Sequence, residues 1–490
     1  MTEVADINLV RISTVKPAVL TESKRMFLPA LDLLWCIVSP VERILFYNIS
    51  CSKFDAIVER LKSSLSTVLV HFYPLAGRLA SGDQQNRLEI DCNDRGVPFV
   101  EAYADLNFSD LQISKFESRP IFKRLVPASL PDEKDDQLLL SVQVTSIHGG
   151  GICIGTRLNH VVADGNSYWH FMQSWAECCR GAPISRYPEH KRYFFKLSNT
   201  SDNVNNTTAT DNEFTFDGSK HAQSKTDKET QQLQSQMPSH ENESSDTKPL
   251  NSNQMSKSIE ESGADEKGNE TRDLICKTFH FSKEMIQKQK ARAEKHGNQT
   301  FSSFVVVAAH FWRCMVKARE IPDEEPVYFF VLVDSRNRVN PPLSPAYFGN
   351  CIQIAASNAT ARELLSQTVS FASGLIKEAV NRCTEKNLMS MIKWVESNVH
   401  SMDAEINSIR ERYIVNVVSS PRFPVYEVDY GWGKPLNVQA AAIDEIGAMV
   451  LFPGREGGGT IDITTCLPLS QMDVFHSLFM EDINSLQPDE

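Results

Sequence analysis

The chain has 490 residues, of which 41% are hydrophobic, 9% aromatic and 23% charged. These proportions exclude a fibrous or membrane-embedded protein, and the length predicts two domains of roughly 200 residues each. The formal net charge of -12 argues against nucleic acid and anionic membranes as partners, because the sequence has no dense basic patch to offset it.

The sequence also indicates where in the cell the protein is located. The N-terminal segment MTEVADINLVRISTVKPAVLTESK lacks the apolar run of a signal peptide, and no later stretch is long and apolar enough to span a membrane. We therefore expect a cytoplasmic protein that acts as a monomer.

The 11 cysteines are scattered without a CxxC pair, which predicts reduced, mostly buried thiols and no metal site.

The first half of the chain reads as mixed helices and strands. Apolar residues recur at spacings of three and four over Phe54–Phe72, which predicts an amphipathic helix packed on a core. Two β-rich runs, Leu138–Thr145 and Ile152–Leu158, flank the glycine cluster Gly149–Gly151 and predict neighbouring strands. A second amphipathic helix is expected to start at Tyr168.

The sharpest boundary is a polar stretch over 198–272, rich in Asn, Ser, Thr, Gln, Asp, Glu and Lys with almost nothing apolar to bury. Its composition predicts a disordered linker or insertion. We therefore expect an N-terminal domain over 1–197 and a C-terminal domain over 273–490.

The second half alternates helical segments with short strands. Thr300 is a plausible N-cap for a helix that buries Phe301 to Met315, and Ala361–Val380 has helical periodicity. The strands are expected at Val327–Val333, Tyr413–Val418, Met449–Phe452 and Thr460–Thr465. The same mixture on both sides of the linker predicts an α/β fold of two similar domains.

The main chemical feature is the segment His160-Val161-Val162-Ala163-Asp164-Gly165, which directly follows the strand ending at Leu158. A His in a turn at a strand end is accessible to substrates. Its pKa near neutrality suits it to take a proton from a hydroxyl that attacks a carbonyl. The alternative is a core histidine beside a turn aspartate.

Two further segments carry distinctive patterns. Asp429-Tyr430-Gly431-Trp432-Gly433-Lys434-Pro435 places glycines and a proline around an aromatic pair and predicts a tight, shape-specific turn. Between the two motifs lie VDSRNRVNPP, from Val333, and YFGNC, from Tyr347.

These segments, in this order, resemble the plant BAHD acyltransferase family, which has an HxxxDG motif, a VDxRxRxxPP…YFGN segment and a DFGWG motif. Outside the linker the resemblance covers nearly the whole chain, including LDLLW from Leu31, HFYPLAGRL from His71 and SFVVVAAHFWR from Ser303. Tyr430 replaces the usual Phe, and the linker is longer than the family's crossover loop.

The resemblance implies two domains like chloramphenicol acetyltransferase, joined by a long crossover loop, with acyl-CoA as co-substrate and no permanently bound cofactor. It implies that His160 is the general base and that Asp164 pairs with an Arg, for which Arg336 is the first choice and Arg338 the second. Trp432 is expected either to stabilise the reacting carbonyl or to be structural. Gly165, Asp429, Gly431 and Gly433 are expected to shape the motifs.

The acyl group and the small-molecule acceptor stay open at this point: hydroxycinnamoyl and malonyl donors, and hydroxyl and amine acceptors, all fit the resemblance. A non-catalytic relative that binds acyl-CoA is the alternative of a different class. A lipase-like hydrolase is suggested by His148-Gly149-Gly150-Gly151, but the sequence has no GxSxG nucleophile segment. The same glycines precede a strand, which disfavours a dinucleotide fingerprint.

Overall fold

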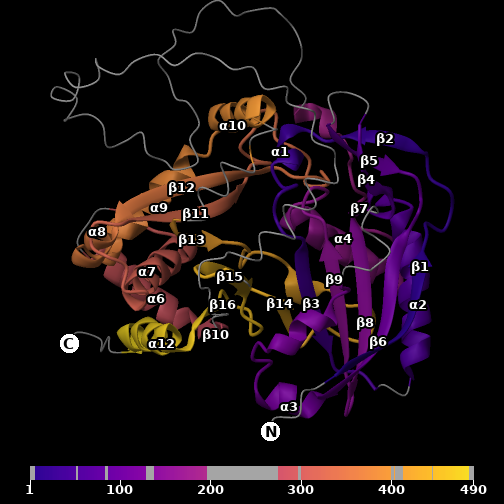
Figure 1. The fold of residues 1–490 in the computed structure, drawn as a ribbon, viewed down its shortest axis with the longest axis horizontal. Helices are drawn as coiled ribbons and strands as arrows, with labels where there is room; N and C mark the ends of the chain where they lie inside the picture. Colours follow the sequence, from indigo (N-terminus) through magenta and orange to yellow (C-terminus); the bar gives the residue numbers. More distant parts are fainter. Residues whose placement is uncertain are drawn as a thin grey trace, which may run out of the picture.

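The computed structural model describes residues 6–50, 53–82, 87–128, 137–195, 274–295, 299–398, 402, 412–443 and 445–484. The linker predicted over 198–272 lies outside the described residues. The described chain forms two six-stranded sheets and a smaller four-stranded sheet, with helices packed against them. In Figure 1 the N-terminal half, indigo to magenta, lies beside the C-terminal half, orange to yellow.

The first sheet is built mainly from the N-terminal half. Its strand order is β1 (Ile7–Val15), β6 (Val97–Asn107), β8 (Leu140–His148), β9 (Ile152–Leu158), β3 (Val41–Tyr47) and β14 (Asn437–Ala440). Helices α2 (Phe54–Leu69) and α4 (Gly165–Cys179) pack on each other and contribute their apolar faces to the same core. The predicted helix at Phe54 and the two predicted strands around the glycine cluster are confirmed.

Shorter elements complete this half. The small sheet has the order β2 (Lys24–Phe27), β5 (Leu88–Cys92), β4 (Arg78–Ser81) and β7 (Gln137–Leu138). The helices and turns are α1 (Ala30–Leu33), η2 (Tyr73–Ala76), α3 (Phe108–Ile113), η3 (Pro120–Leu125) and η5 (Arg192–Phe195).

The second sheet belongs to the C-terminal half. Its order is β10 (Leu274–Phe281), β16 (Ile461–Pro468), β15 (Ala448–Pro453), β13 (Tyr413–Val417), β11 (Pro326–Asp334) and β12 (Ile352–Thr360). Helices α6 (Lys283–Glu294), α7 (Ser303–Ala318), α8 (Ala361–Ser366), α9 (Val369–Arg382) and α12 (Leu469–Asn484) form a second core with this sheet. Helix α10 (Glu385–Asn398) packs on α1, and η7 (Val425–Glu427) precedes β14.

Several helix boundaries differ from the prediction. Helix α4 begins at Gly165, not at Tyr168. The N-cap of α7 is Ser302, whose hydroxyl accepts a 3.2 Å hydrogen bond from the backbone N–H of Val305, so the choice of Thr300 was wrong. The continuous helix expected over Ala361–Val380 is two helices. Gln367 and Thr368 have extended backbone, with ψ of 168° at each, and this ends α8 before α9 begins.

The two halves interlock at β14. This strand comes from the C-terminal half, yet it pairs antiparallel with β3 at the edge of the first sheet (Figure 1). The first core likewise takes in Val425, Val428, Tyr430 and Val438 from the C-terminal half. Residues 273–490 therefore do not all pack around the second sheet, and the domain bounds drawn at 197 and 273 stay a prediction.

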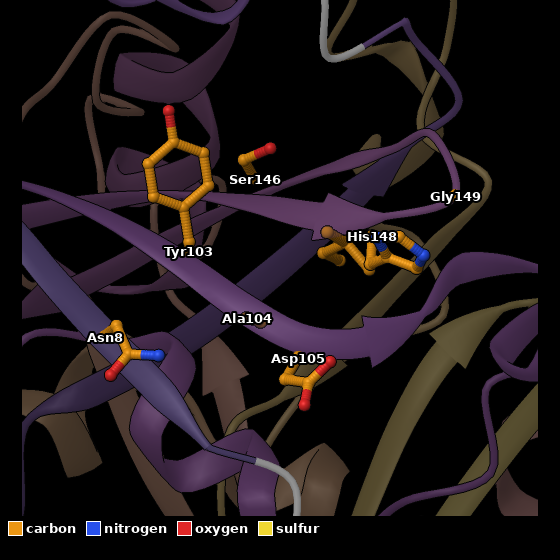
Figure 2. A pocket seen from close by; sticks show the side chains of 8 residues that line it. Asn8, Tyr103, Ala104, Asp105, Ser146, His148 and Gly149 are labelled. Atoms are coloured by element: carbon orange, nitrogen blue, oxygen red, sulfur yellow. The ribbon is translucent and has the colours of Figure 1, made fainter.

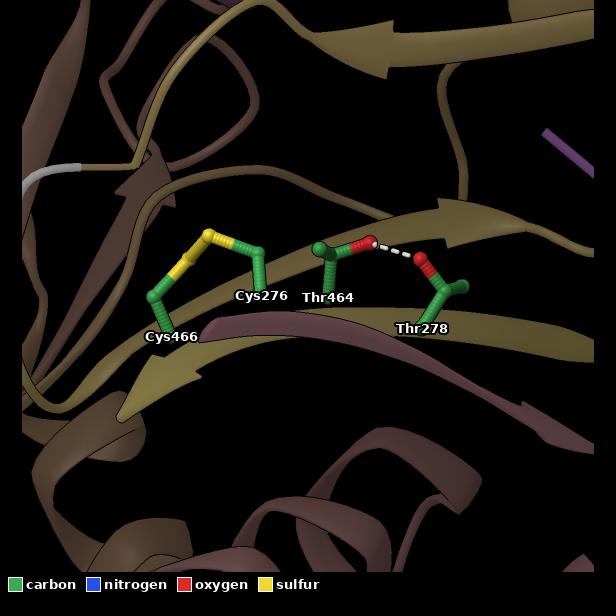
Figure 3. The surroundings of a disulfide bond; sticks show 4 residues. All are labelled: Cys276, Thr278, Thr464 and Cys466. Carbon is green, nitrogen blue, oxygen red and sulfur yellow. Dashed lines mark hydrogen bonds between the residues drawn. A yellow bond between two sulfur atoms is a disulfide. The ribbon is translucent and has the colours of Figure 1, made fainter. Parts of the chain in front are cut away.

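The expectation that the cysteines are reduced is wrong for one pair. Cys276 on β10 and Cys466 on β16 form a disulfide (Figure 3), while eight other described cysteines are outside any disulfide. The two residues are register partners on adjacent antiparallel strands, with Cα atoms 4.0 Å apart. They are separated by 190 residues in sequence, so the pairing depends on a strand register that spacing alone does not reveal.

Within the described part of the chain, no helix combines the length and apolar character needed to cross a bilayer. No group of three His, Cys, Asp or Glu side chains among the same residues is arranged to hold a metal ion.

Candidate active site

The motif His160 to Gly165 forms the turn between β9 and α4. Asp164 is the N-cap of α4, and its Oδ1 accepts a 3.0 Å hydrogen bond from the backbone N–H of Ser167. Gly165 is the first helical residue, where the ring of Phe423 leaves no room for a Cβ atom. The turn geometry therefore depends on the Asp and Gly of the motif.

Asp164 forms a buried ion pair with Arg336. The Arg336 Nη1 atom lies 2.8 Å from Oδ2 of Asp164, and Nη2 lies 3.0 Å from Oδ1. The backbone N–H of Cys351 donates to Oδ2 at 3.0 Å. Arg338 instead donates to the carbonyls of Val380 and Cys383. The first-choice partner of Asp164 is thus confirmed, in a two-pronged geometry that lysine does not provide.

Burial acts on the two charges of this pair in opposition to their attraction. Burial alone raises the pKa of Asp164, but the Arg336 charge and the hydrogen bonds outweigh it and hold that pKa below its ordinary value. Burial likewise lowers the pKa of Arg336, and Asp164 more than reverses this. Both groups are therefore charged at neutral pH.

The ion pair also joins the two halves of the chain. Arg336 lies just beyond β11, and its Nη2 donates to the hydroxyl of Ser167 on α4 at 3.1 Å. That hydroxyl donates to the carbonyl of Gly349 at 2.9 Å. The turn carrying His160 is therefore positioned where segments from both halves meet.

A second buried network holds the main chain of the turn. The side-chain amide of Asn350 donates to the carbonyl of His160 at 2.9 Å and to Oδ1 of Asp32 at 2.8 Å. Arg192 donates to Oδ2 of Asp32 and, at 2.6 Å, to the carbonyl of Val162. Burial raises the pKa of Asp32, and Arg192 and Asn350 oppose that rise.

The positioning roles of Asp32, Asn350 and Arg192 were missed by sequence reasoning. The first two lie within LDLLW and YFGNC, which the sequence singled out only as signs of family resemblance. Arg192 carries no local signal, because its partner Asp32 is 160 residues away in sequence.

The imidazole of His160 is half-buried and stacks on the indole of Trp35. The ring centroids are 4.5 Å apart and the planes differ by 21°. Burial lowers the pKa of His160 below its ordinary value, although Asp164 and Asn350 act in the opposite direction. A neutral imidazole at physiological pH is ready to accept a proton.

The turn Asp429 to Gly433, called the DYGWG clasp below, is closed by hydrogen bonds to its own aspartate. Oδ1 of Asp429 accepts hydrogen bonds from the backbone N–H groups of Gly431 and Gly433, at 2.7 and 2.9 Å. These glycines have φ values of 102° and 103°, a region that other residues rarely adopt. Arg60 on α2 donates to the carbonyls of Tyr430 and Cys179, which fixes the turn against the C-terminal end of α4.

Trp432 is far from His160, which favours the structural alternative over stabilisation of the reacting carbonyl by its indole. Its ring contacts Tyr47, at the end of β3 that pairs with Ile152. Leu158, next to the His160 turn, pairs instead with Val41, six residues back along β3 and so roughly 20 Å away. The length of α4, 15 residues or about 22 Å, separates the two motifs in the same way.

The glycine cluster after His148 is the turn of the β8–β9 hairpin, at the opposite end of β9 from His160. An open hollow of about 370 Å³ lies beside it. Figure 2 shows Tyr103 and Asp105 on β6 and Ser146 and His148 on β8 around this hollow. The length of β9 (Ile152–Leu158) separates the hollow from the HxxxD turn, so the hollow is not the site of the motif's chemistry.

Comparison with known proteins assigns the family. The family model described as "Transferase family" matches residues 5–482. The chain is 32% identical over 435 residues to the BAHD acyltransferase DCR of Arabidopsis thaliana, covering 86% of this chain and 79% of the relative. It is 30% identical over 428 residues to hydroxycinnamoyltransferase 1 of Oryza sativa subsp. japonica, covering 86% and 87%.

A solved structure shares the fold. The crystal structure of F. sporotrichioides TRI101, complexed with coenzyme A and T-2, superposes with a TM-score of 0.68 at 15% identity, over 94% of this chain and 98% of that one. The predicted architecture of two mixed α/β domains, like those of chloramphenicol acetyltransferase, is thereby confirmed. With its HxxxDG turn, buried Asp–Arg pair and DYGWG clasp, the chain belongs to the BAHD acyltransferase family and is a CoA-dependent acyltransferase.

Proposed function

We propose that the protein transfers a hydroxycinnamoyl group from its CoA thioester to a hydroxyl or amine of a small-molecule acceptor, with His160 as the general base. The observation that carries this proposal is the position of His160. It is half-buried, held by its carbonyl to Asn350, and placed at the junction of both halves. The named hydroxycinnamoyltransferase relative supports the donor class.

The reaction proceeds by direct transfer. The imidazole of His160 takes the proton of the acceptor hydroxyl or amine as that atom attacks the thioester carbonyl carbon. The tetrahedral intermediate then expels CoA by breaking the C–S bond, and the imidazolium returns the proton to the thiolate. This cycle leaves no group on the enzyme. The TRI101 complex, which holds both coenzyme A and T-2, supports two substrates bound together.

Asp164 acts indirectly in this mechanism. Both of its oxygens are occupied by Arg336, Ser167 and Cys351. It therefore fixes the turn and the start of α4 and does not relay a proton from His160. Deprotonation by a positioned base of this kind accelerates reactions typically 10² to 10⁴-fold.

The experiment that tests the proposal is a matrix of donors and acceptors. Purified protein is incubated with hydroxycinnamoyl-CoA, malonyl-CoA or acetyl-CoA against phenolic, glycosidic, polyamine and fatty-alcohol acceptors, and products are identified by mass spectrometry. We expect acceptor-dependent release of CoA with hydroxycinnamoyl donors, absent in the His160→Ala control. Preference for malonyl-CoA would reject the donor class. Thioester binding without turnover by any pair would favour the non-catalytic alternative.

A further inference from the structure

Trp35 is placed against the reacting side chain but has no part in the mechanism described so far. It follows α1 in the LDLLW segment, is 7% exposed, and stacks on the imidazole of His160 with ring centroids 4.5 Å apart. The 21° angle between the planes makes this a face-to-face contact. The ring that must gain and lose a proton therefore lies on an aromatic face.

The indole N–H of Trp35 does not explain why a tryptophan stands at this position. Its indole N–H is buried and has no hydrogen-bond partner among the described residues. A buried donor without a partner is costly, and tryptophan is favoured in a core where its N–H reaches an acceptor. A leucine or phenylalanine fills an apolar space without that cost. Trp312 in the second core has a buried N–H of the same kind, so the contact that distinguishes Trp35 is its stack on the imidazole of His160.

The stack is fixed by the same residues that hold the turn. The backbone N–H of Trp35 donates to the carbonyl of Asp32 at 3.1 Å. The side-chain amide of Asn350 bridges Oδ1 of Asp32 and the carbonyl of His160, at 2.8 and 2.9 Å. The main chain at both residues is therefore anchored to one buried Asp–Asn pair, which fixes the positions from which the two rings extend.

We propose that Trp35 is a positioning residue for His160, whose indole face holds the imidazole in place and stabilises the imidazolium formed when the acceptor's proton is taken. This inference rests on the proposed role of His160 as the base. A cation within about 6 Å of an aromatic ring centroid is attracted by the electron density on the ring face, and the attraction strengthens when water is excluded.

Other charged groups around His160 also affect its pKa. Burial lowers the pKa of His160, Arg43 on β3 lowers it further, and Asp164 on the α4 side raises it. Asp164 is paired with Arg336, and Asp32, whose carbonyl accepts from the Trp35 backbone N–H, is paired with Arg192. Because these carboxylates are paired with arginines, they stabilise the imidazolium only in part. The uncharged face of Trp35 adds to that stabilisation.

The test is the pH dependence of kcat/KM for Trp35→Phe and Trp35→Leu. Because the base works in its neutral form, kcat/KM rises with pH through the pKa of His160. Trp35→Leu removes the aromatic face and is expected to move the acidic limb of the pH profile to lower pH by about one pH unit. Its kcat is expected to fall roughly 10- to 100-fold, because the imidazole is no longer held in place. Trp35→Phe keeps a ring and is expected to lie between that variant and wild type.

Trp312→Leu is the matched control. Trp312 on α7 is also fully buried, and its indole N–H also lacks a partner among the described residues, but it packs on Phe329 in the second core. This variant is expected to melt at a lower temperature and keep the wild-type acidic limb. An acidic limb that stays in place or moves to higher pH in both Trp35 variants, or moves equally in Trp312→Leu, overturns the inference.

The results distinguish a failure of the Trp35 inference from a failure of the proposed function. If His160→Ala abolishes turnover while the Trp35 variants keep the wild-type pH profile, His160 is the base and the Trp35 inference alone is wrong. If His160→Ala retains turnover, the proposed function is wrong irrespective of Trp35. Should Trp35→Leu fail to fold, Trp35→Phe decides the question, because it preserves the apolar ring and most of its volume.

Discussion

At the scale of single residues, two side chains four positions apart have different surroundings. His160 is half-buried and its ring is stacked on Trp35, whereas Asp164 is completely enclosed and fully occupied by donors. The sequence predicted the pairing of Asp164 with Arg336, because family resemblance supplied the motif. It did not predict Asp32, Asn350 or Trp35, whose roles arise only from contacts between segments distant in sequence.

Replacing Asp164 by Ala removes the partner of a buried guanidinium and is expected to destabilise the fold by about 3–5 kcal/mol. Asp164→Asn keeps some hydrogen bonding and is expected to lie between that variant and wild type. Thermal melts of the purified variants measure both. A melting temperature of Asp164→Ala equal to that of wild type would show that the Arg336 charge is compensated elsewhere.

The same pair has a pH signature. Because the pKa of Asp164 is lower in the folded protein than in the unfolded one, its contribution to stability is complete above the ordinary carboxyl pKa. The contribution is lost as the pH falls through the folded-state pKa. We therefore expect the stability difference between wild type and Asp164→Asn to be largest near neutral pH and to shrink in acid. A difference that stays constant down to strongly acidic pH would contradict the ionised pair.

At the scale of elements, helix α4 and strand β9 separate two motifs. The sequence had left open whether the second of them, with Trp432, lies at the reaction centre or is structural. The HxxxDG turn lies at the N-terminal end of α4, and the DYGWG clasp lies at its C-terminal end against Arg60. Local patterns predicted both strands of the hairpin and the helices. They could not place Trp432, because its position depends on β14 joining β3, where Asn437 pairs with Phe46, 391 residues away in sequence.

Replacing Trp432 by Phe is therefore expected to change stability and not chemistry. The variant keeps a ring for the contacts with Tyr47 and Tyr430 but alters the contact with the Arg60 guanidinium, 5.5 Å from the indole centroid. We expect a destabilisation of about 1 kcal/mol and a kcat within roughly twofold of wild type. Denaturant titration and steady-state kinetics provide both numbers. A large loss of kcat without loss of stability would restore the catalytic role of the indole.

At the scale of the whole molecule, the two halves meet at the proposed base. Arg336 and Asn350 come from the C-terminal half, and Asp164 and His160 from the N-terminal half, so the site exists only when both halves are docked. Composition and periodicity predicted the mixed α/β architecture and its two parts. They could not predict the interlocking through β14 or the Cys276–Cys466 disulfide, since both depend on strand pairings between segments far apart in the chain.

The central claim is that His160 takes the acceptor's proton, and the most direct measurement is the steady-state turnover of His160→Ala beside its thermal melt and its affinity for CoA. The side chain is half-buried, and the hydrogen bond that Asn350 donates to the His160 carbonyl does not depend on the imidazole. We therefore expect a folded protein that binds CoA like wild type and loses roughly 10² to 10⁴-fold in kcat. A folded His160→Ala protein that turns over at the wild-type rate would contradict the claim.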